Sequence, residues 1–273
     1  MTSESPSGLG DLHSHLVPAV DDGAQSLEDA LEGIGRMKEA GIVRIVTTPH
    51  LEGSLTREPD AYSSFLGRMD EAWEKVSAAA ADEFPDVEFH RGQEVMLDIP
   101  DVDFSEERIR LAGTSFVLVE WPRLQVPPET PRVVSRIRFG GLKPIIAHPE
   151  RYRGVGRELQ IMGEWRRMGA YLQVSYGSFV GRYGDRAKKR AFQLLERGWI
   201  DYLSTDFHGR PNLELYLDEA REILEEAGAD EQFSLLAETN PARLLRDEEP
   251  ISVPGIERES GIWKRLRRLF GLN

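Results

Sequence analysis

Short runs of apolar residues recur along the chain, and longer stretches with helical periodicity lie between them. This alternation is typical of a parallel sheet with crossover helices. Seven runs are predicted to be strands, at residues 9–13, 42–47, 87–94, 116–120, 144–147, 171–174 and 201–204. Further helices are predicted at residues 60–81, 129–139, 157–168, 185–197 and 213–226.

The stretch SLEDALEGIGRMKEAG, between the first two runs, predicts another helix. Ser26 is suited to cap its start and Gly41 to end it. No repeat, low-complexity tract or long linker interrupts the chain, so its 273 residues predict a single α/β domain of barrel type. The apolar face of the helix consists of residues at three- and four-residue spacing, namely Leu27, Ala30, Leu31, Ile34 and Met37.

Composition excludes several classes of function. The net charge of −13 argues against a nucleic-acid surface, because phosphate backbones attract basic proteins. The absence of cysteine excludes disulfides, thiolate metal sites and a cysteine nucleophile. The amino terminus lacks the pattern of a secretory signal, and no run of about 18 apolar residues follows. We therefore expect a soluble cytoplasmic protein.

Imidazoles and carboxylates follow the ends of the predicted strands, where barrels of this kind place their chemistry. Five of the six histidines lie there, which favours coordination over the alternative of structural histidines. The exception, His90, is interpreted as a surface or packing residue. The candidate metal ligands are His13, His15, Asp22, His50, Glu94, Glu120, His148, Asp206 and His208.

This ligand set suits zinc, manganese or iron, because it combines imidazole with carboxylate and lacks thiolate. Nine candidates exceed what one ion accepts from a protein, so two or three ions are expected. Three divalent cations would outweigh the four carboxylates and make the site attractive to phosphate. Arg151 and Arg210 stand beside these ligands in the sequence and are candidate phosphate clamps, with surface salt bridges as the alternative.

The chain resembles the PHP (polymerase and histidinol phosphatase) superfamily, and within it the bacterial manganese-dependent tyrosine-protein phosphatases of capsule and exopolysaccharide operons. The resemblance rests on segments that occur in order between residues 9 and 245. They are DLHSHLVPAVDDGAQSLEDAL, GIVRIVTTPH, GQEVML, VLVEWP, PIIAHPERY, LSTDFHGRP and ETNPARLL.

The resemblance implies a distorted seven-stranded (β/α)7 barrel with three divalent metal ions, manganese being expected and iron or zinc the alternatives. Arg151 and Arg210 match arginines that contact phosphate. Asp21 is expected to contact the metal ligands rather than a metal ion. Glu94 and His148 are expected to reach toward a second metal. The ligands matched to the first metal are His13, His15, Glu94 and Asp206. The remaining ligand positions are Asp22, His50, Glu120 and His208.

The resemblance further implies hydrolysis of phosphotyrosine on a partner protein, expected to be a bacterial tyrosine kinase. In the expected mechanism a metal-bound hydroxide attacks phosphorus in line, while Arg151 and Arg210 stabilise the phosphoryl oxygens. If the reaction uses a general acid, Asp206 and His208 are the nearest candidates, but both are better suited to act as metal ligands. Two alternatives are a phosphoesterase for a small molecule, such as a sugar phosphate or histidinol phosphate, and a non-catalytic metal-binding regulator of polysaccharide export.

Two departures from the family pattern concern the substrate mouth. The histidine that often follows the TPH motif is Leu51 here, and the loop LEGSLTREPDAY diverges. Since such loops shape the mouth of a site, the departures leave the phosphatase chemistry in place and bear on the identity of the substrate.

The two ends of the chain lie outside the matched domain, which is predicted to span residues 9–247. Residues 1–8 are expected to be a flexible extension, and residues 248–273 a second extension. Its segment GIWKRLRRLFGLN, residues 261–273, carries a charge of +4 and predicts a basic amphipathic helix. Its candidate partners are an anionic membrane at the inner face, another protein including a second copy of this chain, and the acidic domain itself.

Overall fold

The computed structural model describes residues 8–154 and 159–256 of the chain. Nine strands within these ranges form two parallel sheets, with the orders β1-β2-β4 and β3-β5-β6-β7-β8-β9. The α/β class with parallel sheets is thus confirmed, and each of the seven predicted runs overlaps a strand. The strands are β1 (Leu9–Ser14), β2 (Ile42–Thr47), β3 (His50–Glu52), β4 (Glu88–Arg91), β5 (Glu94–Met96), β6 (Phe116–Glu120), β7 (Lys143–Ala147), β8 (Tyr171–Ser175) and β9 (Tyr202–Ser204).

A proline breaks the strand path between β2 and β3. Pro49 has no backbone N–H and cannot donate to a sheet ladder. The N–H of Thr48 donates to the carbonyl of Ser14 at 2.6 Å, and the N–H of Glu94 donates to the carbonyl of Pro49 at 3.2 Å. Beyond this bend β3 pairs with β5, and His50 lies opposite Glu94. The break therefore brings two candidate ligands side by side.

The carboxyl end of β1 lies beside the segment that follows β9. Ser14 and Phe207 form an isolated parallel bridge, and the N–H of His15 donates to the carbonyl of Phe207 at 2.8 Å. The N–H of Asp206 donates to the carbonyl of His13 at 3.0 Å. The described residues nevertheless form two sheets and no single closed one, so the expected closed barrel of seven strands is not confirmed.

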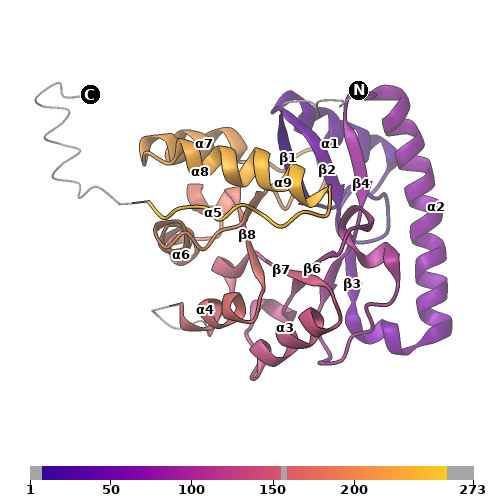
Figure 1. Ribbon diagram of the computed structural model, residues 1–273. Coiled ribbons are helices and arrows are strands. Elements are labelled where there is room, and N and C mark those ends of the chain that lie inside the picture. The colour runs from indigo at the N-terminus through magenta and orange to yellow at the C-terminus, as the bar shows by residue number, and fades with distance from the viewer. Residues whose placement is uncertain (1–7, 155–158, 257–273) are drawn as a thin grey trace, which may run out of the picture.

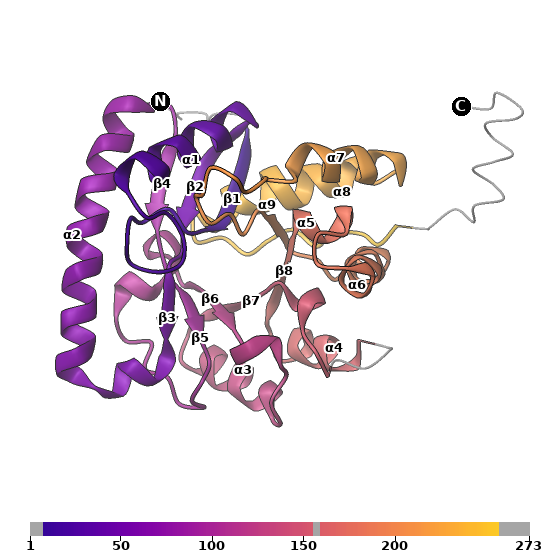
Figure 2. The same cartoon turned by 180° about the vertical axis from the view of Figure 1, so that it is seen from behind.

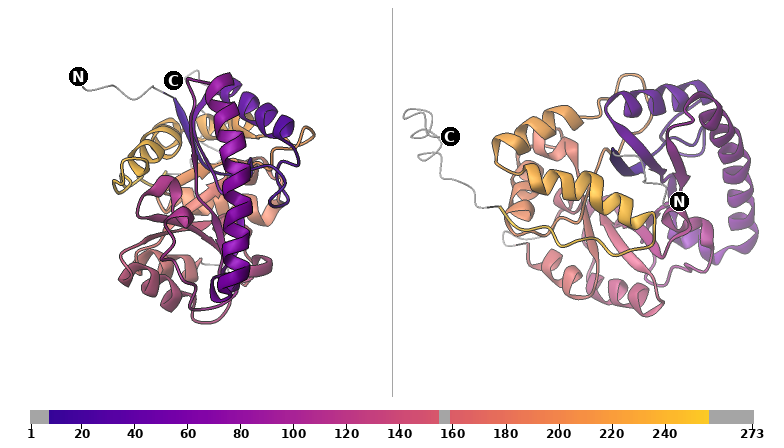
Figure 3. Two further views of the ribbon diagram at one scale, coloured as in Figure 1. Left: turned by 90° about the vertical axis from the view of Figure 1, so that its right-hand side faces the viewer. Right: turned by 45° about the horizontal axis from the view of Figure 1, so that its top comes forward.

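Helices surround the strands (Figures 1 and 3). Figure 2 shows α2 along one side, with α7 and α8 together at the opposite end. The helices at the predicted places are α1, α2, α3, α4, α6 and α7, whereas the five-residue helices α5, α8 and α9 were not predicted. Their bounds are α1 (Leu27–Glu39), α2 (Pro59–Glu83), α3 (Thr130–Phe139), α4 (Gln160–Arg167), α5 (Tyr176–Val180), α6 (Asp185–Glu196), α7 (Leu217–Glu226), α8 (Asp230–Ser234) and α9 (Asn240–Leu244).

The helix α1 shows how local sequence signals set element boundaries. The hydroxyl of Ser26 accepts a hydrogen bond from the N–H of Asp29 at 3.0 Å, as a cap residue does. Gly41 follows the helix with a φ of +85°, a conformation that glycine adopts readily. The predicted apolar face is buried at Ile34 and Met37, while Leu27 at the helix start is exposed.

The chain remains packed beyond the predicted domain end at residue 247. Val253 and Ile256 are buried in the core. The side-chain amide of Asn240 donates to the carbonyl of Ile251 at 3.1 Å and accepts from the N–H of Ile251 at 2.8 Å. Residues 1–7 of the extension predicted at residues 1–8, and the predicted basic helix at residues 261–273, lie outside the described residues. Among the described residues, every helix is too short or too polar to cross a bilayer.

Candidate metal centre

Two histidines at the end of β1 open the site. The rings of His13 and His15 are buried, and each is held through its Nδ1 atom. His13 Nδ1 lies 2.9 Å from the amide oxygen of Gln173 on β8, and His15 Nδ1 lies 2.7 Å from a carboxylate oxygen of Asp21. These contacts leave both Nε2 atoms directed at the centre of the cluster, as in histidines whose second nitrogen is a metal ligand.

Glu94 on β5 is the central carboxylate. Its Oε2 atom lies 3.2 Å from His13 Nε2 and 3.1 Å from His50 Nδ1. Its Oε1 atom lies 3.0 Å from His148 Nε2, at the end of β7. His50 pairs with Glu94 where β3 lies beside β5, and Met96 of β5 pairs with Glu120 of β6. His50 and Glu94 begin β3 and β5, and Glu120 ends β6, so three neighbouring strands contribute side chains to the site.

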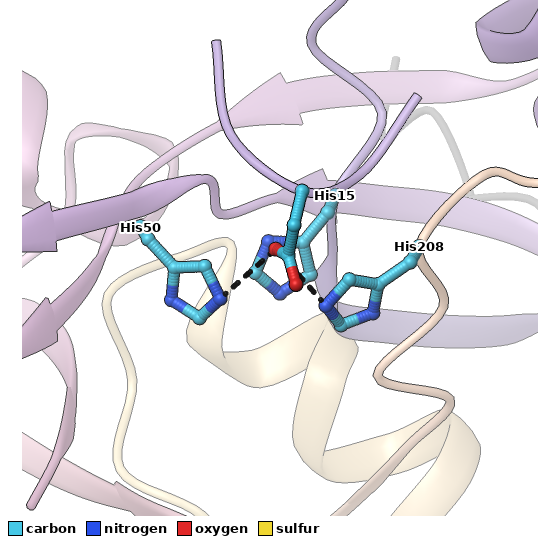
Figure 4. A group of neighbouring side chains, drawn as sticks. His15, His50 and His208 are labelled. Atoms are coloured by element: carbon cyan, nitrogen blue, oxygen red, sulfur yellow. Dashed lines mark ion pairs between the residues drawn. The ribbon is translucent and has the colours of Figure 1, made fainter. Parts of the chain in front are cut away.

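Asp22 connects two histidines on the more exposed side. Its Oδ1 atom lies 3.4 Å from both His50 Nε2 and His208 Nε2. Figure 4 shows these two ion pairs, with His15 between His50 and His208. The ring of His15 stacks on that of His208 with centroids 4.2 Å apart. Asp22 thus ties the loop after β1 to the loops after β2 and β9.

All nine predicted ligands come together. Four overlapping groups have ligand atoms within 4.8 Å of one another, and every candidate belongs to at least one of them. The groups are His15, Asp22, His50 and His208; His13, His15 and Glu94; His13, His148 and Asp206; and His50, Glu94 and Glu120. His90 lies apart from them in β4, as the sequence predicted.

The backbone is strained at two of these positions. His148 has a φ of +35° and Asp206 a φ of +53°, values that non-glycine residues rarely adopt. Each conformation is held by a hydrogen bond, from the N–H of Arg151 to the carbonyl of His148 and from the N–H of Asp206 to the carbonyl of His13. Such strain is concentrated at functional sites, where it directs a side chain.

The charges of the cluster shift the pKa values of its members. Burial alone would lower the pKa of His13, but Glu94 and Asp206 outweigh it and raise this pKa to about 9. Burial and the charge of Glu94 raise the pKa of Glu120 to about 7. Burial and the charge of Arg151 lower the pKa of His148 to about 4. The carboxylates thus favour a positive charge at His13, whereas burial and Arg151 oppose one at His148.

The residues fit divalent metal ions. Among the described residues His13 Nε2, His15 Nε2 and Glu94 Oε2 are buried without a hydrogen-bond partner, a rare state for polar atoms in a folded protein. Metal ions would satisfy all three, and an imidazole and carboxylate set suits manganese, iron or zinc.

The two predicted arginines border the cluster on different sides. Arg151 is 19% exposed, pairs with the carboxylate of Asp206, and lies with its guanidinium carbon 4.2 Å from the ring centre of Tyr183. Arg210 is exposed, and its Nη2 atom donates to the carbonyl of Asp22. The ion pair of Arg151 is therefore part of the site, which argues against the surface alternative for this residue.

Three further residues support the site and were not predicted. Gln173 holds His13, and Asp11 accepts hydrogen bonds from the N–H groups of His13 at 2.9 Å and Thr205 at 2.6 Å. The buried carboxyl of Glu150 accepts from the Ser178 hydroxyl at 2.6 Å, and burial raises its pKa to about 7. Asp11 lies two residues before His13, and Glu150 lies directly before Arg151. Their closeness in the sequence to candidate residues is the signal that could have identified them.

A parallel α/β fold in which imidazoles and carboxylates cluster in groups that could hold a metal ion defines the class of α/β proteins with metal-binding sites. The phosphotriesterase homology protein from Escherichia coli shares the fold, with a TM-score of 0.54 at 11% identity over 88% of this chain and 99% of that one. The chain belongs to the capsular polysaccharide synthesis CpsB/CapC family, whose model matches residues 9–246.

Relatives within this family are similar over nearly their whole length. The tyrosine-protein phosphatase YwqE from Bacillus subtilis is 28% identical over 96% of this chain and 98% of its own. The tyrosine-protein phosphatase CpsB from Streptococcus pneumoniae is 25% identical over 87% and 98%. A crystal structure from a study of YwqE and CpsB, described as unique metal-dependent tyrosine phosphatases, has a TM-score of 0.74 at 26% identity, over 91% of this chain and 99% of that one.

Proposed function

We propose that this protein is a metal-dependent protein-tyrosine phosphatase that hydrolyses phosphotyrosine monoesters and takes part in the control of capsule or exopolysaccharide synthesis. The observation that carries the proposal is the convergence of nine candidate ligands and Arg151 in one cluster. The similarity to tyrosine-protein phosphatases over nearly the whole chain supports it.

Three divalent ions, with manganese expected and iron or zinc as alternatives, would be held by the nine clustered residues. Overlap among the four groups supports this number, since Glu94, His13, His15 and His50 each belong to two of them. When bound, such ions supply Lewis acidity that activates water and neutralises the charge of a phosphoryl group.

Arg151 is proposed to bind and orient the phosphoryl group. Its guanidinium is fixed on two sides, by the carboxylate of Asp206 and by the ring of Tyr183. A guanidinium held in this way offers its remaining N–H groups to phosphate oxygens with little loss of side-chain entropy. Arg210 is proposed to contact the same group from the side of Asp22.

The leaving group needs little help from the protein. A tyrosine phenol has a pKa near 10, so the phenolate leaves more readily than a serine alkoxide. Asp206 and His208 are therefore proposed to act as ligands, and neither is required as a proton donor.

We also propose that the two sheets work as one distorted seven-stranded barrel, with β2–β3 and β4–β5 each forming one bent strand. The Ser14–Phe207 bridge supports this arrangement. The proposed substrate is a phosphorylated tyrosine kinase in the cytoplasm, at or near the inner membrane face. A homo-oligomer is compatible with this proposal.

The test compares substrates and metals in one assay. The purified protein is incubated with a phosphotyrosine peptide, a sugar phosphate and histidinol phosphate, with added manganese or after chelation. We expect phosphotyrosine to be preferred and chelation to abolish turnover. Full activity in the chelated protein, or a preference for either small molecule, contradicts the proposal.

A further inference from the structure

A cavity of about 180 Å³ adjoins the candidate metal centre. Arg151, Asp206 and His208 line it on the side of the cluster. Aromatic and aliphatic side chains line the other side, and the charged Arg182 and Glu214 stand exposed at its rim. The apolar lining consists of Tyr183, Phe207, Leu213 and Tyr216.

Two tyrosines from different segments form a wall of this cavity. Tyr183 lies in the turn between α5 and α6, where Gly181 and Gly184 have φ values of +93° and +86°. Tyr216 precedes α7 with a φ of +57°, a strained value for a tyrosine. Both tyrosines therefore stand where the backbone turns, one between α5 and α6 and the other at the start of α7.

Both rings rest on a glycine in α5. A Cβ atom at Gly177 would lie 3.1 Å from Tyr183 Cε2 and 3.4 Å from Tyr216 Cδ2. The absence of a side chain at this position leaves room for both rings beside the helix. Since the guanidinium of Arg151 stacks on Tyr183, the same wall also touches the proposed phosphate-binding residue.

We propose that Tyr183 and Tyr216 form the subsite for the phenyl ring of the substrate, so that this centre selects aryl over alkyl phosphate monoesters. The inference rests on the proposed function and adds the residues that determine its specificity. A cavity on the order of 150 Å³ holds a benzene ring, so this cavity suits a tyrosine side chain. A phosphoserine would place its phosphate at Arg151 but leave the aromatic wall without contacts.

Binding is measured first, because it does not depend on turnover. Isothermal titration calorimetry of the manganese-loaded protein compares phenylphosphonate with methylphosphonate, which carry the same charged group on different bodies. We expect the wild type to prefer the phenyl compound. Tyr216→Ala is expected to lower this preference about tenfold, the effect of one aromatic contact, and Tyr216→Phe to retain it.

Tyr62→Ala is the matched control, since Tyr62 is a partly buried tyrosine of α2 that does not line the cavity. It is expected to leave the phenyl preference unchanged. In the kinetic arm, Tyr216→Ala is expected to raise the KM of a phosphotyrosine peptide while changing kcat less than KM, as a residue that contacts the ring requires.

A glycine pair tests the wall without removing either tyrosine. Gly177→Ala is expected to shift the ring of Tyr183, which would lie 3.1 Å from the added methyl group, and so to weaken the phenyl preference, while Tyr216 at 3.4 Å keeps an ordinary contact. Gly67→Ala, on α2 with no atom within 4 Å of the added Cβ, is the control and is expected to leave it unchanged.

The outcomes separate the two proposals. If the wild-type protein hydrolyses no phosphotyrosine peptide, the proposed function is wrong, and the proposed phenyl subsite is then wrong as well. If the wild type is active but folded Tyr216→Ala keeps the full phenyl preference, the subsite alone is wrong.

Discussion

The Nδ1 atom of His15 lies 2.7 Å from a carboxylate oxygen of Asp21, the first of two adjacent aspartates. The same oxygen accepts the N–H of His50 at 3.0 Å, whereas Asp22 faces the rings of His50 and His208. Neighbouring carboxylates therefore have different tasks, since Asp21 orients a histidine and Asp22 is placed to bind an ion.

This difference predicts unequal effects on metal binding. Asp21→Ala is expected to weaken metal affinity about 10- to 100-fold, the usual cost of removing a partner that orients a ligand. Competition with a chromophoric chelator measures the affinity. Asp82→Ala, at an exposed aspartate of α2, is the control. Unchanged affinity in Asp21→Ala would show that His15 does not need this support.

Glu94 is predicted to be indispensable for metal content. Glu94→Gln removes a buried charge that lies within 3.6 Å of four imidazoles, so we expect loss of most bound metal. Elemental analysis of the purified variant measures this loss. Glu52→Gln, at an exposed position of β3, should keep the wild-type content. Equal metal in both variants would contradict the central place of Glu94.

Arg151 is predicted to matter through its geometry as well as its charge. Arg151→Ala is expected to lower kcat/KM for an aryl phosphate by about 10²- to 10³-fold, the cost of losing one preorganised group that stabilises transition-state charge. Arg151→Lys keeps the charge but loses the planar stack on Tyr183, and should recover only part of the rate. Arg132→Ala, at an exposed position of α3, serves as the control. A full recovery by lysine would refute the geometric requirement.

Asp201 is predicted to make stability fall as pH rises. Burial raises the pKa of its carboxyl from 3.8 to about 6, although Arg166 pairs with it. The folded state therefore holds this proton to higher pH than the unfolded state does. The contribution is largest below pH 4 and is lost as pH rises through 6, by at most about 3 kcal/mol.

The measurement is the free energy of unfolding in urea at pH 4.5 and pH 7. Asp201→Asn removes the titrating group, so the difference in stability between variant and wild type should shift in favour of the variant at the higher pH. Parallel pH dependence in the two proteins would refute this assignment.

The sequence predicted the α/β class, and the nine candidate residues that it indicated lie together in the structure, because the ends of parallel strands meet at one edge of a sheet. The position of Leu51 follows from another regular feature of strands. It follows His50 on β3 and is buried in the core, since successive side chains point to opposite faces of a strand.

Other features depended on long-range packing that leaves no local pattern. Gln173 lies in an otherwise apolar strand, and only the fold brings it within 2.9 Å of His13. Tyr183 and Tyr216 both lie beside Gly177 of α5, a helix too short to show a period in the sequence. The bend at Pro49 follows from a missing N–H, but the new register after it depends on a partner strand more than 40 residues away.

The candidate metal centre forms only when β3, β5 and β6 pair in their native register. A slip of β5 by one residue would turn Glu94 to the opposite face, away from His50 and Glu120. A misregistered chain would retain much of its secondary structure but lose its capacity for metal. Metal uptake during refolding therefore reports when these strands have found their native partners, which spectroscopic helix content cannot do.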